Sequence, residues 1–191
     1  SAPFRLATLG GVVEVTIADP QQSITVTMGR ATFWSDQIPV TGPRREVLNE
    51  ELVLGGRTLR YCAASVGNPH CVVLWDGELS PAVAREYGPQ LECAPRFPRR
   101  TNVQFMRVED AHRVRIEIWE RGAGYTLASG SSATAVAAVA MRLGYCQSPV
   151  TVSMPGGDLT VTAAADMMLR QTGPTALVCE CRWFGRDGDQ A

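Results

Sequence analysis

The fold is decided by the stretch Trp119-Glu120-Arg121-Gly122-Ala123-Gly124-Tyr125-Thr126-Leu127-Ala128-Ser129-Gly130-Ser131, which continues as SATAVAAVAMRLG over residues 132–144. A charged pair ends a strand, a glycine-rich turn follows, and a helix is predicted from about Ser131 to Leu143, with Gly144 as its stop. The free N–H groups at the start of such a helix can bind an anion. Because the helix has almost no polar face, it must be buried on every side, which suits a curved sheet wrapped around it.

Two more motifs precede this stretch in the chain. They are Gly67-Asn68-Pro69-His70-Cys71-Val72-Val73 and Phe97-Pro98-Arg99-Arg100-Thr101-Asn102-Val103-Gln104-Phe105. With residues 120–133 they resemble, in the same order, three motifs of the diaminopimelate epimerase family. The resemblance implies an α+β fold in which a barrel-like β-sheet wraps around a central apolar helix, as one of two pseudo-symmetric halves. It also implies epimerisation or racemisation of an amino acid by two-sided acid–base transfer of the α-proton, without a cofactor.

The chain departs from the family pattern at both catalytic thiols. Ser129 stands where the family's motif has cysteine, and no segment resembles the N-terminal motif that carries the family's first thiol. Residues 7–13 resemble a Thr-Ala-Gly-Gly element from the middle of the family's proteins. We therefore expect the C-terminal part of a longer protein, inactive in isolation. Residues 1–18 would be a remnant of the N-terminal half, and residues 19–176 would be the epimerase-like domain. Residues 177–191 would form a strand that returns to the N-terminal half, followed by a tail. The strand itself is expected over about Ala176 to Trp183.

Residue 129 carries the sharpest hypothesis. The resemblance makes Ser129 a catalytic acid–base residue, although a hydroxyl is a far weaker acid than a thiol at a helix N-terminus. The alternative is that Ser129 only caps the helix, together with Ser131. The backbone N–H groups of Gly130 and Ser131 are the predicted partners of the substrate's α-carboxylate.

Glu120 and Arg121 end the strand that leads into the glycine turn. As a plain surface ion pair they would contribute little to stability. Beside this turn they are better explained as substrate ligands. Arg121 would hold a carboxylate with its planar fork, and Glu120 would receive an ammonium group next to the reacting centre, as a catalytic and substrate-binding residue.

The two earlier motifs supply three more polar candidates. On the residues alone, Asn68 and Asn102 are ordinary turn residues and His70 is a satisfied histidine at the start of a strand. The resemblance places both asparagines against the distal end of the substrate and makes an assisting acid–base role for His70 an equal alternative. Cys71 points to the opposite side of its strand from His70 and is expected in the core.

Composition limits the partners. The 191 residues carry a net charge of −1 with acidic and basic residues mixed, which leaves no nucleic-acid or membrane-surface footprint. The longest small-apolar run is too short to span a bilayer. Six cysteines without C-x-x-C spacing and only two histidines argue against a metal site. We expect reduced cysteines in a cytoplasmic protein, with Cys179 and Cys181 packed on a strand as small apolar groups.

Local patterns predict the remaining elements. A helix should run from about Pro81 to Tyr87 and stop at Gly88-Pro89. His112, beside Asp110, should lie in a solvated hairpin turn. Half-buried strands are predicted by alternation at residues 13–17, 24–28 and 113–118, and hairpins by glycine turns within residues 52–62 and 152–161.

The favoured function is that of diaminopimelate epimerase, an isomerase that interconverts LL- and meso-diaminopimelate in lysine and peptidoglycan precursor synthesis. Its partners would be a small-molecule amino-acid substrate, the missing N-terminal half of the same protein and a second copy in a homodimer, with no cofactor, metal, nucleic acid or membrane. Two alternatives stay open. One is a one-base relative, a dehydratase or a racemase of another amino acid. The other is a non-catalytic amino-acid-binding module.

Overall fold

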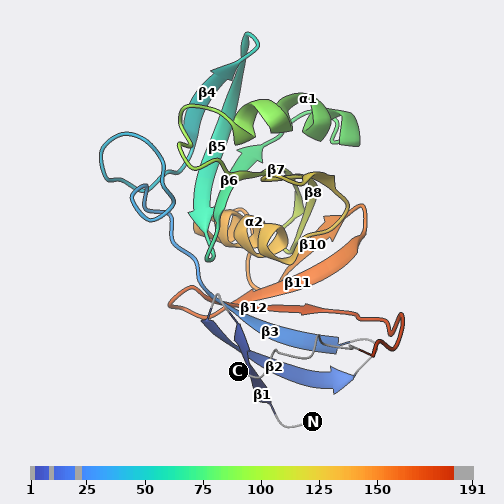
Figure 1. The fold of residues 1–191 in the computed structure, drawn as a ribbon. Helices are drawn as coiled ribbons and strands as arrows, with labels where there is room; N and C mark the ends of the chain where they lie inside the picture. The colour runs from blue at the N-terminus through green and yellow to red at the C-terminus, as the bar shows by residue number, and fades with distance from the viewer. Residues whose placement is uncertain (1–2, 9–10, 20–22, 183–191) are drawn as a thin grey trace, which may run out of the picture.

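A single curled sheet and two helices make up the part of the protein that the computed structural model describes, residues 3–8, 11–19 and 23–182 (Figure 1). The helices are α1 (Pro81–Glu92) and α2 (Gly130–Arg142). The strands are β1 (Phe4–Thr8), β2 (Gly11–Asp19), β3 (Ser23–Arg30), β4 (Glu50–Leu54), β5 (Arg57–Ser65), β6 (Pro69–Leu74), β7 (Asn102–Asp110), β8 (Arg113–Glu120), β9 (Gly124–Thr126), β10 (Val150–Met154), β11 (Gly157–Ala163) and β12 (Met168–Gly173).

The strands follow the order β1-β2-β3-β12-β11-β10-β8-β7-β6-β5-β4, with β9 paired to β8. Neighbours are antiparallel except for two parallel pairs, β6 with β7 and β8 with β10. Each parallel pair is joined through a helix, as parallel strands require. The sheet curls so that seven strands, from β5 to β8 and from β10 to β12, contact α2. The predicted barrel-like sheet around a central helix is therefore confirmed.

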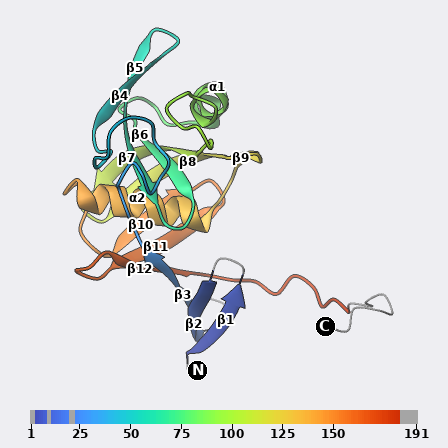
Figure 2. The same ribbon diagram turned by 60° about the vertical axis from the view of Figure 1, so that its left-hand side comes forward.

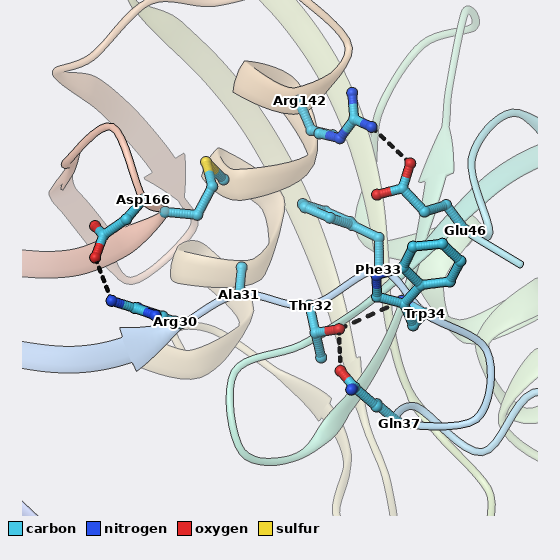
Figure 3. Close-up of a pocket in the computed structure, with 10 residues that line it drawn as sticks. Arg30, Ala31, Thr32, Phe33, Trp34, Gln37, Glu46, Arg142 and Asp166 are labelled. Atoms are coloured by element: carbon cyan, nitrogen blue, oxygen red, sulfur yellow. Dashed lines mark hydrogen bonds and ion pairs between the residues drawn. The ribbon is translucent and has the colours of Figure 1, made fainter.

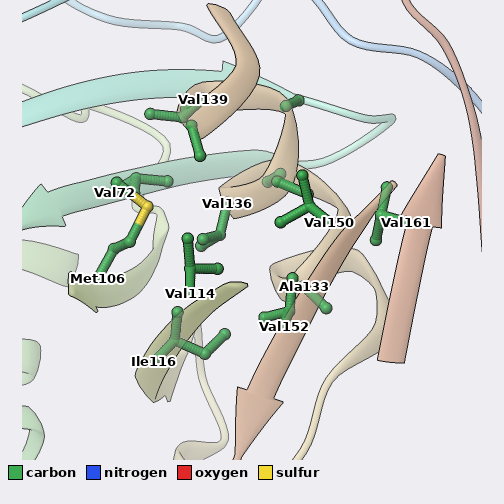
Figure 4. Close-up of a cluster of buried hydrophobic side chains, with 14 of the residues drawn as sticks. Val72, Met106, Val114, Ile116, Ala133, Val136, Val139, Val150, Val152 and Val161 are labelled. Atoms are coloured by element: carbon green, nitrogen blue, oxygen red, sulfur yellow. The ribbon is translucent and has the colours of Figure 1, made fainter. Parts of the chain in front are cut away.

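Helix α2 forms the main core with the inner face of the sheet. Every residue from Ser132 to Ala140 is buried, so the prediction of a helix covered on all sides is correct. Its alanines let the surrounding strands approach closely, and valines from both sides fill the remaining space (Figure 4). The helix begins at Gly130 after the cap residue Ser129 and ends near Gly144, whose φ of 74° suits glycine.

Helix α1 covers the outer face of the sheet, so β7 and β8 lie between the two helices (Figure 2). A second apolar core fills this outer layer and includes Tyr61, Trp75, Phe97 and Phe105. Residues of β6 alternate between the two cores. His70 points to the α2 side, and Cys71 is fully buried in the outer core, as predicted.

The prediction that α1 stops at Gly88-Pro89 is wrong, because the helix continues to Glu92. Gly88 is not a stop signal here but a packing residue, since a Cβ at this position would lie 2.5 Å from Cγ of Trp119. Pro89 removes only one N–H from the helix, and the packing against β8 outweighs that loss.

The predicted strands and hairpins are present, but burial does not follow the predicted alternation everywhere, and β8 shows the clearest departure. Val114, Ile116 and Ile118 of β8 are buried toward α2. Glu117, which alternation would place in solvent, is buried as well, and it accepts a hydrogen bond from the Tyr125 hydroxyl at 2.8 Å. Glu117 is buried because α1 covers this face of β8 and because Tyr125 of the paired strand β9 reaches its carboxylate.

The segment after β12 has no regular secondary structure over residues 174–182, and Trp183 lies outside the described residues. The strand expected over about Ala176 to Trp183, beside the N-terminal half, stays a prediction. Cys179 and Cys181 are exposed, with their sulfur atoms 3.6 Å apart, and are not packed as apolar groups. An alternating segment becomes a strand only beside a partner, and within the described residues none pairs with this segment.

Candidate active site

The N-terminus of α2 is the centre of the candidate site. Ser129 is the cap residue, and its Oγ accepts a hydrogen bond from the Ser132 backbone N–H at 3.5 Å. The N–H groups of Gly130 and Ser131 precede the first hydrogen bond within the helix and point out of its end. This end combines a half-buried hydroxyl with an anion-binding backbone. Proton transfer by Ser129 stays a prediction.

Side chains from two distant parts of the chain close around this helix end. On one side is Gln171 of β12, and a Cβ added at Gly130 would lie 2.9 Å from its Nε2. On the other side is Asn68, whose Nδ2 donates to Oγ of Ser131 at 3.4 Å. Residue 130 therefore has no room for a side chain unless Gln171 moves.

His70 lies behind Asn68 and is fully buried. Its Nε2 is 2.8 Å from Oδ1 of Asn68. Burial lowers the pKa of His70 to about 3, and the nearby charge of Arg121 lowers it further. The imidazole is therefore neutral at neutral pH. Its predicted role as an assisting acid or base stays a prediction.

Glu120 and Arg121 lie at the turn between β8 and β9. The half-buried Glu120 carboxylate has no hydrogen-bond or ion-pair partner within the described residues. The Arg121 side chain is exposed, and its Nη1 donates to the carbonyl of Arg99 at 3.2 Å. Each charged group is thus free to meet a ligand of opposite charge, as their predicted roles require.

Asn102 joins the two earlier motifs to this turn. Its Oδ1 accepts a hydrogen bond from the Arg121 backbone N–H at 3.0 Å, and its Nδ2 donates to the carbonyl of Pro69 at 2.9 Å. The side chain is buried. Asn102 therefore holds Arg121 and the turn at Asn68 in place, and the predicted contact with the distal end of the substrate stays a prediction.

A cavity of about 340 Å³ lies beside Asn68 and Arg121. Arg99 and Arg121 both line it, and neither guanidinium has a carboxylate partner among residues 23–182 of the described chain. The single acidic residue in the lining, Asp36, is 3.2 Å from Arg44 and so is already paired. The cavity is positively charged and suits an anionic group. Its full lining is Asp36, Gln37, Pro39, Ser65, Gly67, Asn68, Pro69, Arg99 and Arg121.

A larger cavity, of about 500 Å³, lies elsewhere and contains none of the predicted site residues (Figure 3). It lies where β3 runs into the following loop, near the last turn of α2. Its charges are paired across its rim, Arg30 with Asp166 at 2.5 Å and Arg142 with Glu46 at 2.6 Å. Because these charges are already paired, the cavity is a weaker candidate for binding an ion.

The sequence interpretation missed two buried polar residues that support the site. Glu92 accepts hydrogen bonds from the Gly122 backbone N–H at 3.0 Å and from Nε1 of Trp119 at 2.8 Å, and so fixes the turn that carries Arg121. Glu92 could have been found only by extending α1 beyond Pro89. Gln104 donates to Oγ of Ser132 at 2.9 Å. Only one feature of the sequence could have indicated Gln104, namely that it is a polar residue inside an otherwise apolar strand.

The described residues contain no group of three or more His, Cys, Asp or Glu side chains that could hold a metal ion. None of the described helices is long and apolar enough to cross a bilayer.

Comparison of the fold with solved structures gives neighbours among epimerases and racemases. A hydroxyproline epimerase from Agrobacterium vitis, solved with bound trans-4-hydroxy-L-proline, has a TM-score of 0.65 at 17% identity, over 91% of this chain and 56% of its own. The predicted epimerase PA4716 from Pseudomonas aeruginosa has a TM-score of 0.61 at 16% identity, over 96% of this chain and 67% of its own. At these identities the likeness is one of fold.

Sequence comparison is more specific. The Diaminopimelate epimerase 2 of Nostoc sp. is 51% identical over 170 residues, which are 89% of this chain and 59% of the relative. The Diaminopimelate epimerase of Pseudomonas aeruginosa is 38% identical over 178 residues, 93% of this chain and 63% of the relative. The chain thus spans about three fifths of the length of these relatives. A family model described as Diaminopimelate epimerase matches residues 62–178. The chain belongs to the diaminopimelate epimerase family.

Proposed function

We propose that the protein containing this chain is a cofactor-independent amino-acid epimerase, with diaminopimelate as its substrate. The observation that carries the proposal is the anion-binding end of α2, capped by Ser129, beside the positively charged cavity of Asn68 and Arg121. Diaminopimelate has a carboxylate and an ammonium group at each end, so it can occupy both places. The names of the relatives, Diaminopimelate epimerase, favour this substrate over other amino acids.

The proposed reaction moves protons at the α-carbon. The N–H groups of Gly130 and Ser131 hold the α-carboxylate and stabilise the negative charge that it gains as the α-proton leaves. A base on the opposite face of the substrate removes that proton, and the Ser129 hydroxyl returns a proton on its own face. Glu120 receives the ammonium group, and Arg121 holds the distal carboxylate. Charge balances because one proton is removed and one is added.

The opposite base would come from the N-terminal half of the protein. Exposed apolar side chains at both ends of the chain support such a partner, Phe4 and Leu6 in β1 and Leu177 and Val178 after β12. We propose that residues 1–18 and 177–191 pack against that half and that 19–176 form the domain that carries α2. Membership of the family also leads us to propose a cytoplasmic location and a homodimer. Cell fractionation tests the location, and analytical sedimentation tests the dimer.

A one-base relative is the second candidate, and the observation in its favour is the serine at position 129. A hydroxyl can return a proton to a carbanion more readily than it can remove one. Such a site would exchange the α-proton from one starting isomer only, or would eliminate water from a substrate with a suitable leaving group.

Exchange of the α-proton in deuterated water tests the proposal. The complete protein is incubated with LL- or meso-diaminopimelate, as the natural form and as Ser129→Cys. A thiol serves in both directions, so the cysteine variant should exchange faster, by about 10²–10⁴-fold if acid–base catalysis makes its usual contribution.

Ser80, which caps α1 without a side-chain hydrogen bond, supplies the matched control Ser80→Cys, which should leave the rate unchanged. Equal exchange in the natural and Ser129→Cys proteins, from both isomers, would reduce Ser129 to a helix cap.

A further inference from the structure

Two arginines line the cavity beside Asn68, and most of their N–H donors are unused. The Arg121 guanidinium makes one hydrogen bond, from Nη1 to the backbone carbonyl of Arg99 at 3.2 Å. Arg99 is exposed, and its guanidinium has no hydrogen-bond or ion-pair partner within the described residues. A guanidinium presents its donors in a planar fork that matches a carboxylate, so both arginines can still bind an anion.

The turn that carries Arg99 is anchored in the outer core. Phe97 is buried there, with its ring centroid 5.8 Å from that of Tyr61. The Phe97 carbonyl accepts a hydrogen bond from the Arg100 N–H at 2.9 Å, and Arg100 has a φ of 57°, a left-handed conformation that redirects the chain. The two neighbouring arginines separate here. The Arg100 guanidinium lies 3.5 Å from Glu92, whereas Arg99 lines the cavity.

Within the described residues, no carboxylate that lines this cavity is free to neutralise Arg99 and Arg121. Asp36 is the acidic residue of the lining, and it pairs with Arg44 at 3.2 Å. Arg44 is itself held in place, because its guanidinium lies 4.0 Å from the centroid of the Trp34 ring. Two like charges that share a cavity repel each other, and an anion bound between them offsets that repulsion.

We propose that Arg99 is a specificity-determining residue, which together with Arg121 binds the second carboxylate of a dicarboxylic amino acid. Asn68 lines the same cavity and donates to Oγ of Ser131 at 3.4 Å, so the cavity adjoins the end of α2. One ligand can therefore place a carboxylate at each position. That this ligand is the amino-acid substrate rests on the proposed function.

The charge of the cavity distinguishes the two groups at the distal end of diaminopimelate. The guanidinium groups of Arg99 and Arg121 attract the carboxylate and repel the ammonium, and Asp36 is already paired. Lysine makes this distinction measurable, because it is diaminopimelate without the distal carboxylate and keeps the distal ammonium. Arg99 should therefore strengthen the binding of diaminopimelate and weaken the binding of lysine.

Calorimetric binding of LL-diaminopimelate and of L-lysine to the complete protein tests this inference. In Arg99→Gln the affinity for diaminopimelate should fall about tenfold, the effect of one charge-assisted hydrogen bond lost at an exposed position. The affinity for lysine should rise, because a repelling charge is removed. Damage to the fold would weaken both ligands, so it cannot produce changes of opposite sign. Arg99→Lys keeps the charge without the fork and should restore part of the affinity for diaminopimelate.

Arg100→Gln is the matched control, because it removes the same charge from the next residue of the same turn. The Arg100 guanidinium faces Glu92 and does not line the cavity. Both affinities should stay within about twofold of those of the natural protein. An equal loss of diaminopimelate binding in Arg100→Gln and Arg99→Gln would mean that only the general positive charge of this surface attracts the ligand. That result, or an unchanged affinity in Arg99→Gln, would overturn the role of Arg99.

Inorganic phosphate separates this inference from the proposed function, because it probes the two guanidinium groups without an amino acid. In NMR spectra of the arginine-labelled complete protein, phosphate should shift the Nε–H signals of Arg99 and Arg121 together and leave that of Arg100 unchanged. These shifts in a protein that binds no diaminopimelate would overturn the proposed function and leave the anion site of Arg99 and Arg121 intact. Phosphate that shifts neither signal would overturn the paired site.

Discussion

Replacing Glu92 with glutamine should destabilise the protein by about 2–3 kcal/mol. The Glu92 carboxylate accepts from Nε1 of Trp119 at 2.8 Å and from the Gly122 N–H at 3.0 Å. A hydrogen bond to a charged group contributes about 1.5–3 kcal/mol. A glutamine amide can accept one of these bonds, but its NH₂ then faces the other donor. Arg100, 3.5 Å away and with 62% of its side chain exposed, adds little.

Urea denaturation measures this effect. With a slope of about 2 kcal/mol/M, the midpoint should fall by roughly 1 M for Glu92→Gln, and about twice as far for Glu92→Ala, which leaves both donors unpaired. Amide exchange at Gly122 should become faster in both variants, because this N–H loses its acceptor.

The matched control is Glu86→Gln in the same helix, where the carboxylate is exposed and should contribute within about 0.5 kcal/mol. If Glu92→Gln and Glu86→Gln unfold at the same urea concentration, Glu92 does not hold the turn between β8 and β9. The account of how Arg121 is positioned would then fail with it.

Three other predictions concern packing, pH and the ligand. Gly88→Ala should lower the free energy of unfolding by about 1–3 kcal/mol, since its Cβ would meet Trp119 at 2.5 Å, and an unchanged urea midpoint would contradict this. Burial lowers the pKa of His70 to about 3, so between about pH 6.5 and 3 only the unfolded chain binds a proton at this imidazole. The free energy of unfolding should therefore fall by roughly 2 kcal/mol from pH 6.5 to 5. Denaturation curves of His70→Gln should not show this dependence on pH. Arg121→Lys should weaken diaminopimelate binding in calorimetry, because a single ammonium cannot replace the guanidinium fork, whereas Arg113→Lys, at an exposed ion pair, should not.

The helices and strands whose apolar residues follow a regular local pattern could be predicted from the sequence. The run of small, almost entirely apolar residues from Ala133 to Ala140 has no polar face to turn toward water, so it determined by itself that α2 is buried. Glycine turns similarly determined the hairpins of β4 with β5 and of β10 with β11. The order of the three motifs predicted that Asn68 and Arg121 belong to one site. In the structure both residues line the same cavity.

The positions of buried polar groups could not be predicted in this way. Alternation placed Glu117 in solvent, yet α1 and β9 cover it, and the early stop assigned to α1 hid Glu92 altogether. The strand expected after Ala176 stays a prediction for a related reason, since its alternation has no partner strand within the described chain. Each of these outcomes depends on a segment that lies far away in the sequence.

By itself the sequence determined the family's motifs, the burial of α2 and the residue types at its N-terminus, because all of these follow from neighbouring residues. Only the tertiary structure decided which donors face which acceptors. Gln104 and Ser132 come from separate elements, and their hydrogen bond depends on a distance that no local pattern contains. The contacts around the N-terminus of α2 are therefore a property of the packed sheet and helix.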